Sequence, residues 1–185
     1  MMPARRKLLK IGGLMVTAAA VGALARPLRA APRDEGRAKR VALRNLHTGE
    51  SLDLEFFRDG VYLPAAMSAV EVLLRDYRND ARHPIEPTLL DYLVDVAARA
   101  GVDPEFRVIS GYRSPQTNRM LHERSDGVAT HSLHMQGRAI DVRLAGVGCA
   151  DLATQALAMN RGGVGYYRKS DFVHLDTGAF RTWRG

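Results

Sequence analysis

The stretch Ser132-Leu-His-Met-Gln-Gly-Arg-Ala-Ile-Asp-Val142 decides how the fold is interpreted, because it carries an acid inside an otherwise apolar run. A strand over 137–144 would place Ile140 and Val142 on its core face. The opposite face would hold Gly137, Ala139, Asp141 and Arg143. The small glycine and alanine leave that face open, so it has room for a metal ion with a bound water.

A second stretch, Phe172-Val-His-Leu-Asp176, predicts another strand near the end of the chain. Its alternation places His174 and Asp176 on one face, together with the phenylalanine, and two aliphatic residues on the other. Two strands that each present a ligand-type side chain can converge on one ion. The pair of stretches therefore indicates a polar site on one side of a sheet.

Two imidazoles and one carboxylate would be available at such a site, from His134, His174 and Asp141. Three protein ligands that leave a fourth position for water are typical of catalytic zinc sites. The spacing is also compatible with an aspartate and histidines that only make hydrogen bonds within the fold. On spacing alone, His131 can take the place of His134.

The rest of the chain predicts an α+β fold, with helices early and strands clustered near the polar residues. Apolar periodicity predicts helices at 64–79, 87–100, 115–124 and 151–160, and strands at 41–47, 51–56, 106–110, 137–144, 162–167 and 172–176. Thr48-Gly-Glu50 predicts a hairpin turn between the first two strands. Gly101 is expected to end a helix, and Ser114 with Pro115 to begin one.

Most of the net charge of +7 lies at the N-terminus. Residues 1–30 contain six basic residues and no acid, and a basic cluster precedes an apolar run, as in an export signal. Arg5-Arg-Lys-Leu-Leu-Lys10 resembles a twin-arginine signal, in which case the protein is bacterial and exported by the twin-arginine translocation machinery. A plain secretory signal or a retained membrane anchor are the alternatives. We predict a signal at 1–30, a linker at 31–40 and one domain at 41–185.

Composition excludes several classes of protein. An apolar content of 46% and a charged content of 25% are those of a globular chain, and a single cysteine excludes an internal disulfide framework. A basic total charge suggests nucleic acid as a partner, but without the signal the remaining residues are nearly neutral. We therefore expect no nucleic-acid partner.

Four sequence blocks resemble one family. They are Ser110-Gly-Tyr-Arg-Ser-Pro-Gln-Thr-Asn118, Ser132-Leu-His-Met-Gln-Gly137, Gly162-Gly-Val-Gly-Tyr-Tyr167 and Phe172-Val-His-Leu-Asp-Thr-Gly178. They are similar to the YcbK-like periplasmic murein endopeptidases, within the D-Ala-D-Ala metallopeptidase group that shares the hedgehog/DD-peptidase fold. The resemblance implies a small antiparallel sheet packed with helices. It also implies a zinc-dependent peptidase, of the DD- or LD-endopeptidase or the carboxypeptidase type, that acts on peptidoglycan stem peptides and their cross-links in the periplasm, and it leaves open which bond is cut. A metal-containing binding module without catalytic activity is the alternative.

The resemblance also implies roles for particular residues. His134, Asp141 and His174 would be the zinc ligands, and Arg113 would stabilise the substrate carbonyl or pair with a substrate carboxylate. The alternative for Arg113 is a surface salt bridge. Ser132 would touch the substrate, or else cap the following turn.

The general base is predicted less directly. Related peptidases carry an acid three residues before the last histidine, and Asp171 occupies that position. Asp176 is the rival, as the base itself or as a hydrogen-bond partner of His174. The glycines of Gly162-Gly-Val-Gly165 would allow either a close approach of the substrate backbone or close packing within the protein.

Overall fold

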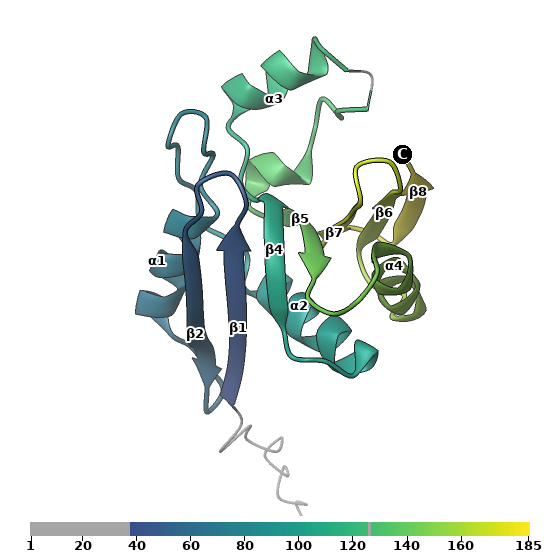
Figure 1. The fold of residues 1–185 in the computed structure, drawn as a ribbon. Coiled ribbons are helices and arrows are strands. Elements are labelled where there is room, and N and C mark those ends of the chain that lie inside the picture. The colour runs from purple at the N-terminus through teal and green to yellow at the C-terminus, as the bar shows by residue number, and fades with distance from the viewer. Residues whose placement is uncertain (1–37, 126) are drawn as a thin grey trace, which may run out of the picture. The chain divides into compact units, whose positions relative to one another are not determined.

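The computed structural model describes residues 38–125 and 127–185. These residues form an eight-stranded mixed sheet with the order β3-β2-β1-β4-β5-β7-β6-β8 (Figure 1). The strands are β1 Ala38–Asn45, β2 Ser51–Arg58, β3 Val61–Tyr62, β4 Glu105–Ser110, β5 Ala139–Leu144, β6 Gly163–Tyr167, β7 Phe172–Asp176 and β8 Arg181–Arg184. Neighbouring strands are antiparallel except for the parallel pairs β1–β4 and β6–β8.

The helices are α1 Pro64–Leu73, α2 Pro87–Ala100, α3 Pro115–His122, α4 Cys149–Ala158 and the short 3-10 helix η1 Leu133–Gln136. Local signals explain several of their ends. Gly101 adopts a left-handed conformation with φ of 74° after α2. The Ser114 hydroxyl accepts a hydrogen bond from the Thr117 backbone N–H at the start of α3. The predicted α+β class is confirmed, and the sheet is mixed instead of purely antiparallel as the resemblance implied.

One hydrophobic core joins the sheet to α1, α2 and α4. Each of these helices buries apolar side chains, among them Val70, Leu89 and Leu152, against the aliphatic residues of the strands. In β5, Ile140 and Val142 are fully buried in this core. The alternating Asp141 is therefore directed to the opposite face of the sheet. The alternation thus separates the core from the polar site.

Three further expectations from the sequence, on the bounds of single elements, differ from the structure. The helix expected at 64–79 ends at Leu73, because the buried Asp76 carboxylate accepts hydrogen bonds from the Ser114 backbone N–H (2.9 Å) and hydroxyl (2.7 Å). Gly137 does not belong to β5: it ends η1 with φ of 65°, packed against the Pro84 carbonyl. Strand β1 begins at Ala38, so the last part of the predicted linker 31–40 is β-strand.

The predicted export signal lies outside the described residues. No helix in the described part of the chain is both long and apolar enough to cross a lipid bilayer.

Candidate metal centre

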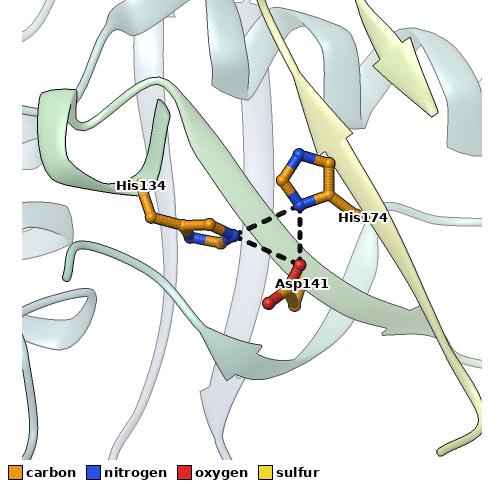
Figure 2. Close-up of side chains that lie close together, drawn as sticks. All are labelled: His134, Asp141 and His174. Atoms are coloured by element: carbon orange, nitrogen blue, oxygen red, sulfur yellow. Dashed lines mark hydrogen bonds and ion pairs between the residues drawn. The ribbon is translucent and has the colours of Figure 1, made fainter. Parts of the chain in front are cut away.

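Three buried side chains from separate elements meet on the polar side of the sheet (Figure 2). Asp141 and His174 are register partners on the adjacent antiparallel strands β5 and β7, and His134 comes from η1. His134 Nε2 lies 3.3 Å from Asp141 Oδ1 and 3.2 Å from His174 Nδ1. His174 Nδ1 lies 2.9 Å from the same Asp141 oxygen. The structure thus brings together the three predicted metal ligands.

Hydrogen bonds at the far side of each ring fix which nitrogen faces the centre. His134 Nδ1 lies 2.7 Å from the Gly111 carbonyl oxygen, which can only accept, so Nδ1 carries the proton. His174 Nε2 likewise donates to Asp176 Oδ2 at 2.9 Å. His134 Nε2 and His174 Nδ1 therefore face the Asp141 carboxylate, and with a metal bound both nitrogens would offer it a lone pair.

The distances between these atoms fit a zinc ion. Tetrahedral coordination with bonds of roughly 2.0–2.2 Å places neighbouring ligand atoms about 3.3–3.6 Å apart. The separations of 3.3 and 3.2 Å lie at the lower end of this range, and the third, 2.9 Å, is shorter. The far-side hydrogen bonds match the partners that metal-ligating histidines generally have. Donor types, separations and orientations thus fit a metal ion with three protein ligands.

The electrostatics of the cluster also favour a cation. Burial would raise the pKa of the Asp141 carboxyl, but His134 and His174 outweigh it and hold that pKa well below its usual range. Burial would lower the pKa of His174, but its hydrogen bonds to Asp141 and Asp176 raise it to about 9. Burial lowers the pKa of His134. The site thus favours a positive charge beside Asp141, which either a proton on His174 or a bound metal would supply.

The three residues lie on the wall of a cavity of about 560 Å³. Arg113 lines the same cavity, with its Nη2 3.9 Å from Asp141 Oδ2 and its Nη1 donating to Asn118 Oδ1 at 3.4 Å. Its buried Nε has no hydrogen-bond partner among the described residues, and burial lowers the pKa of the guanidinium. Arg113 is thus a largely buried guanidinium at the cavity whose hydrogen-bonding groups are only partly paired, and it is not part of a surface salt bridge.

Ser132 and His131 also line the cavity. The Ser132 hydroxyl accepts a hydrogen bond from the His134 backbone N–H at 3.4 Å, so it caps η1 and helps to place the histidine. The cluster of possible metal ligands in the described residues contains His134 and not His131.

The two candidate bases occupy different places. The Asp171 side chain is 67% exposed and lies 3.3 Å from Arg143 Nε. Burial, followed by the neighbouring Asp171, raises the pKa of the Cys149 thiol to about 11. Asp171 is not among the residues that line the cavity. Asp176 is fully buried directly beside His174. The structure therefore brings Asp176 to the metal centre and does not bring Asp171 there.

Sequence reasoning missed a second group of residues at the cavity. Tyr167, Arg181 and Trp183 line it from β6 and β8. The indole lies 5.1 Å from the His174 ring, centroid to centroid. An arginine and a tryptophan two residues apart share one face of a strand, and this alternation is the signal that could have indicated β8.

Comparisons with known proteins agree with this geometry. The family model described as peptidoglycan L,D-endopeptidase MepK (Peptidase M15_2) matches residues 33–183. Peptidoglycan L,D-endopeptidase MepK of Escherichia coli K12 is 40% identical over 179 residues, which cover 97% of this chain and 96% of that protein. The probable peptidoglycan L,D-endopeptidase MepK of Haemophilus influenzae is 40% identical over 146 residues, 78% of each protein. No solved structure matches the chain. The resemblance to the YcbK-like endopeptidases is confirmed, and the chain belongs to the Peptidase M15_2 family of peptidoglycan endopeptidases.

Proposed function

We propose that this protein is a zinc-dependent peptidoglycan L,D-endopeptidase that cuts cross-links between stem peptides in the periplasm. The observation that carries the proposal is the convergence of His134 Nε2, His174 Nδ1 and Asp141 Oδ1 within 3.3 Å of one another on a cavity wall. Membership of the family supports the substrate class. The L,D bond is the one named for the relatives in Escherichia coli and Haemophilus influenzae.

The three ligands would hold one zinc ion and leave a position open towards the cavity. When bound, zinc lowers the pKa of a coordinated water and polarises the scissile carbonyl. Arg113 lines the cavity, and its guanidinium would donate to the carbonyl oxygen as negative charge develops there, or to a substrate carboxylate. Ser132 would contact the substrate while its hydroxyl continues to cap η1.

Asp176 has a positioning role in this proposal. Its carboxylate accepts five hydrogen bonds, which occupy the lone pairs of both oxygens and leave none for a water proton. Its contact with His174 Nε2 keeps the ring oriented with Nδ1 towards Asp141. We propose that Asp171, whose carboxylate faces Arg143 and Cys149, is not the general base.

Export through the twin-arginine machinery remains part of the proposal, on the strength of Arg5-Arg6 and the apolar run that follows them. N-terminal sequencing of the periplasmic protein would test whether the signal is cleaved. We expect the mature chain to begin at Arg26 or Ala31, after the small-residue site Ala23-Leu-Ala25 or Leu28-Arg-Ala30. An intact N-terminus in the periplasmic fraction would contradict the cleaved signal.

Hydrolysis of purified, cross-linked muropeptides tests the enzymatic function. Wild-type protein supplied with zinc is expected to convert L,D-cross-linked dimers to monomers, identified by mass spectrometry. His134→Ala is expected to lose this activity, whereas His47→Ala, at a histidine stacked on Tyr77 away from the cavity, keeps it. Identical product profiles for wild type and His134→Ala would refute the enzymatic function and leave a metal-containing binding module.

A further inference from the structure

The Asp176 carboxylate is the junction between the metal centre and the C-terminal strand. Its Oδ1 accepts hydrogen bonds from the Gly163 backbone N–H (3.0 Å), the Gly178 backbone N–H (2.8 Å) and Arg181 Nη1 (3.1 Å). Its Oδ2 accepts from Arg181 Nη2 at 2.6 Å and from His174 Nε2 at 2.9 Å. One carboxylate thus joins a metal ligand on one side to an arginine of β8 on the other.

Arg181 holds both oxygens of Asp176 at once. Two parallel charged hydrogen bonds of this kind fix the plane of a carboxylate as well as its position. Asp176 is completely buried, so its charge needs such partners, while the Arg181 side chain remains 46% exposed and lines the cavity. Two of the five donors to Asp176 are backbone amides, and one is the His174 ring. The other two belong to Arg181, whose guanidinium is always charged.

The glycine motif of β6 provides the space for this arrangement. A Cβ atom on Gly163 would lie 2.6 Å from Arg181 Nη1 and closer still to Asp176 Oδ2. A Cβ on Gly165 would lie 2.6 Å from Trp183 Nε1. The motif thus serves close packing of β8 and Asp176, the second of its two expected uses.

Trp183, on the same strand as Arg181, also packs beside His174. Its ring lies 5.1 Å from the His174 ring, its Nε1 donates to the Tyr167 hydroxyl at 2.9 Å, and the Arg181 guanidinium lies 5.2 Å from its ring centre. Arg181 and Trp183 therefore reach the metal centre from a strand of four residues at the end of the chain.

From this geometry we infer that Arg181 is a positioning residue of the metal centre, acting through Asp176 on His174. The inference rests on the proposed metal-dependent function. Arg181 fixes the Asp176 carboxylate, which in turn holds the His174 Nε2–H and keeps Nδ1 directed at Asp141. Without Arg181, Asp176 keeps three of its five hydrogen bonds and orients His174 less strictly.

The affinity for Zn²⁺ tests this inference, measured on the purified protein by competition with a chromophoric chelator. Loss of a residue that orients a metal ligand typically costs about 10- to 100-fold in affinity, and we expect such a loss for Arg181→Ala. Arg181→Lys keeps a charge but not both hydrogen bonds, so we expect an intermediate loss. The control is Arg184→Ala on the same strand, an exposed arginine that makes no ion pair with a described residue; we expect a change below about twofold.

A double-mutant cycle separates positioning from a general structural effect. If Arg181 acts through Asp176, Arg181→Ala causes little further loss of affinity in an Asp176→Asn background. Thermal unfolding in the presence of chelator identifies which variants are folded. If Arg181→Ala does not fold, Arg181→Lys replaces it in the measurement of zinc affinity. Zinc affinities equal to wild type in both Arg181 variants, or additive losses in the cycle, would overturn the inference. A wild-type protein that binds no zinc would instead refute the proposed metal centre.

Discussion

Gly163→Ala is a one-carbon change whose cost follows from the packing around Asp176. The added Cβ would lie 2.6 Å from Arg181 Nη1 and nearer to Asp176 Oδ2, whereas ordinary contact begins at 3.4 Å. Groups must therefore move by at least about 0.8 Å, and Asp176 is fully buried. Overpacking costs about 1–3 kcal/mol, and a lost hydrogen bond to a charged group costs about 1.5–3 kcal/mol. We expect the free energy of unfolding to fall by about 2–3 kcal/mol.

Urea denaturation in the presence of chelator would measure this loss without a contribution from bound metal. Gly148→Ala is the matched control, because its Cβ would meet nothing closer than Asp151 Oδ2 at 3.8 Å. Gly148 is the N-cap of α4, where alanine is less favourable, so we expect a loss below about 1 kcal/mol. The zinc affinity of Gly163→Ala should also fall, since the displaced carboxylate holds His174. A Gly163→Ala protein as stable as wild type would refute the packing argument.

Three further predictions concern other parts of the chain. Arg113→Ala should lower kcat on cross-linked muropeptides by about 10²- to 10³-fold while zinc content stays unchanged; loss of zinc together with activity would contradict a role towards substrate. Asp171→Asn should leave kcat within about threefold of wild type, whereas a fall of about 100-fold or more would make Asp171 the general base. Burial would raise the pKa of Asp76, but hydrogen bonds from Thr117 and Ser114 outweigh it and lower that pKa below 3.8. The stabilisation from Asp76 should therefore be complete above pH 3.8 and disappear as the pH falls through the lowered pKa. Urea denaturation between pH 2 and 7 should show the stability gap between wild type and Asp76→Asn narrowing at the acid end, and a constant gap would contradict it.

Much of the metal centre could be predicted because its two strands show alternating patterns of apolar and polar residues over short stretches of sequence. Asp141 interrupts an apolar run, and His174 alternates with Val173 and Leu175, so both patterns separate a core face from a polar face. The position of His134 followed from the family resemblance, since its own element is a single short turn. These signals depend on residues that are close together in the sequence.

The features that were missed depend on contacts between distant residues. Strand β8 has four residues that are half-exposed or exposed, and it is a strand because it pairs in parallel with β6. Helix α1 ends early because Asp76 bonds to the start of α3. The turn at Gly137 fits against Pro84, which lies far away in the sequence. No local pattern contains such tertiary contacts.

The metal content of the purified protein tests the central claim most directly. Elemental analysis of the folded wild-type protein should give about one zinc per chain. Asp141→Ala, which removes one of three ligands, should lose most of it, while Asp53→Ala at an exposed position of β2 should retain it. Full zinc occupancy in Asp141→Ala would contradict the assignment of His134, Asp141 and His174 as the metal centre.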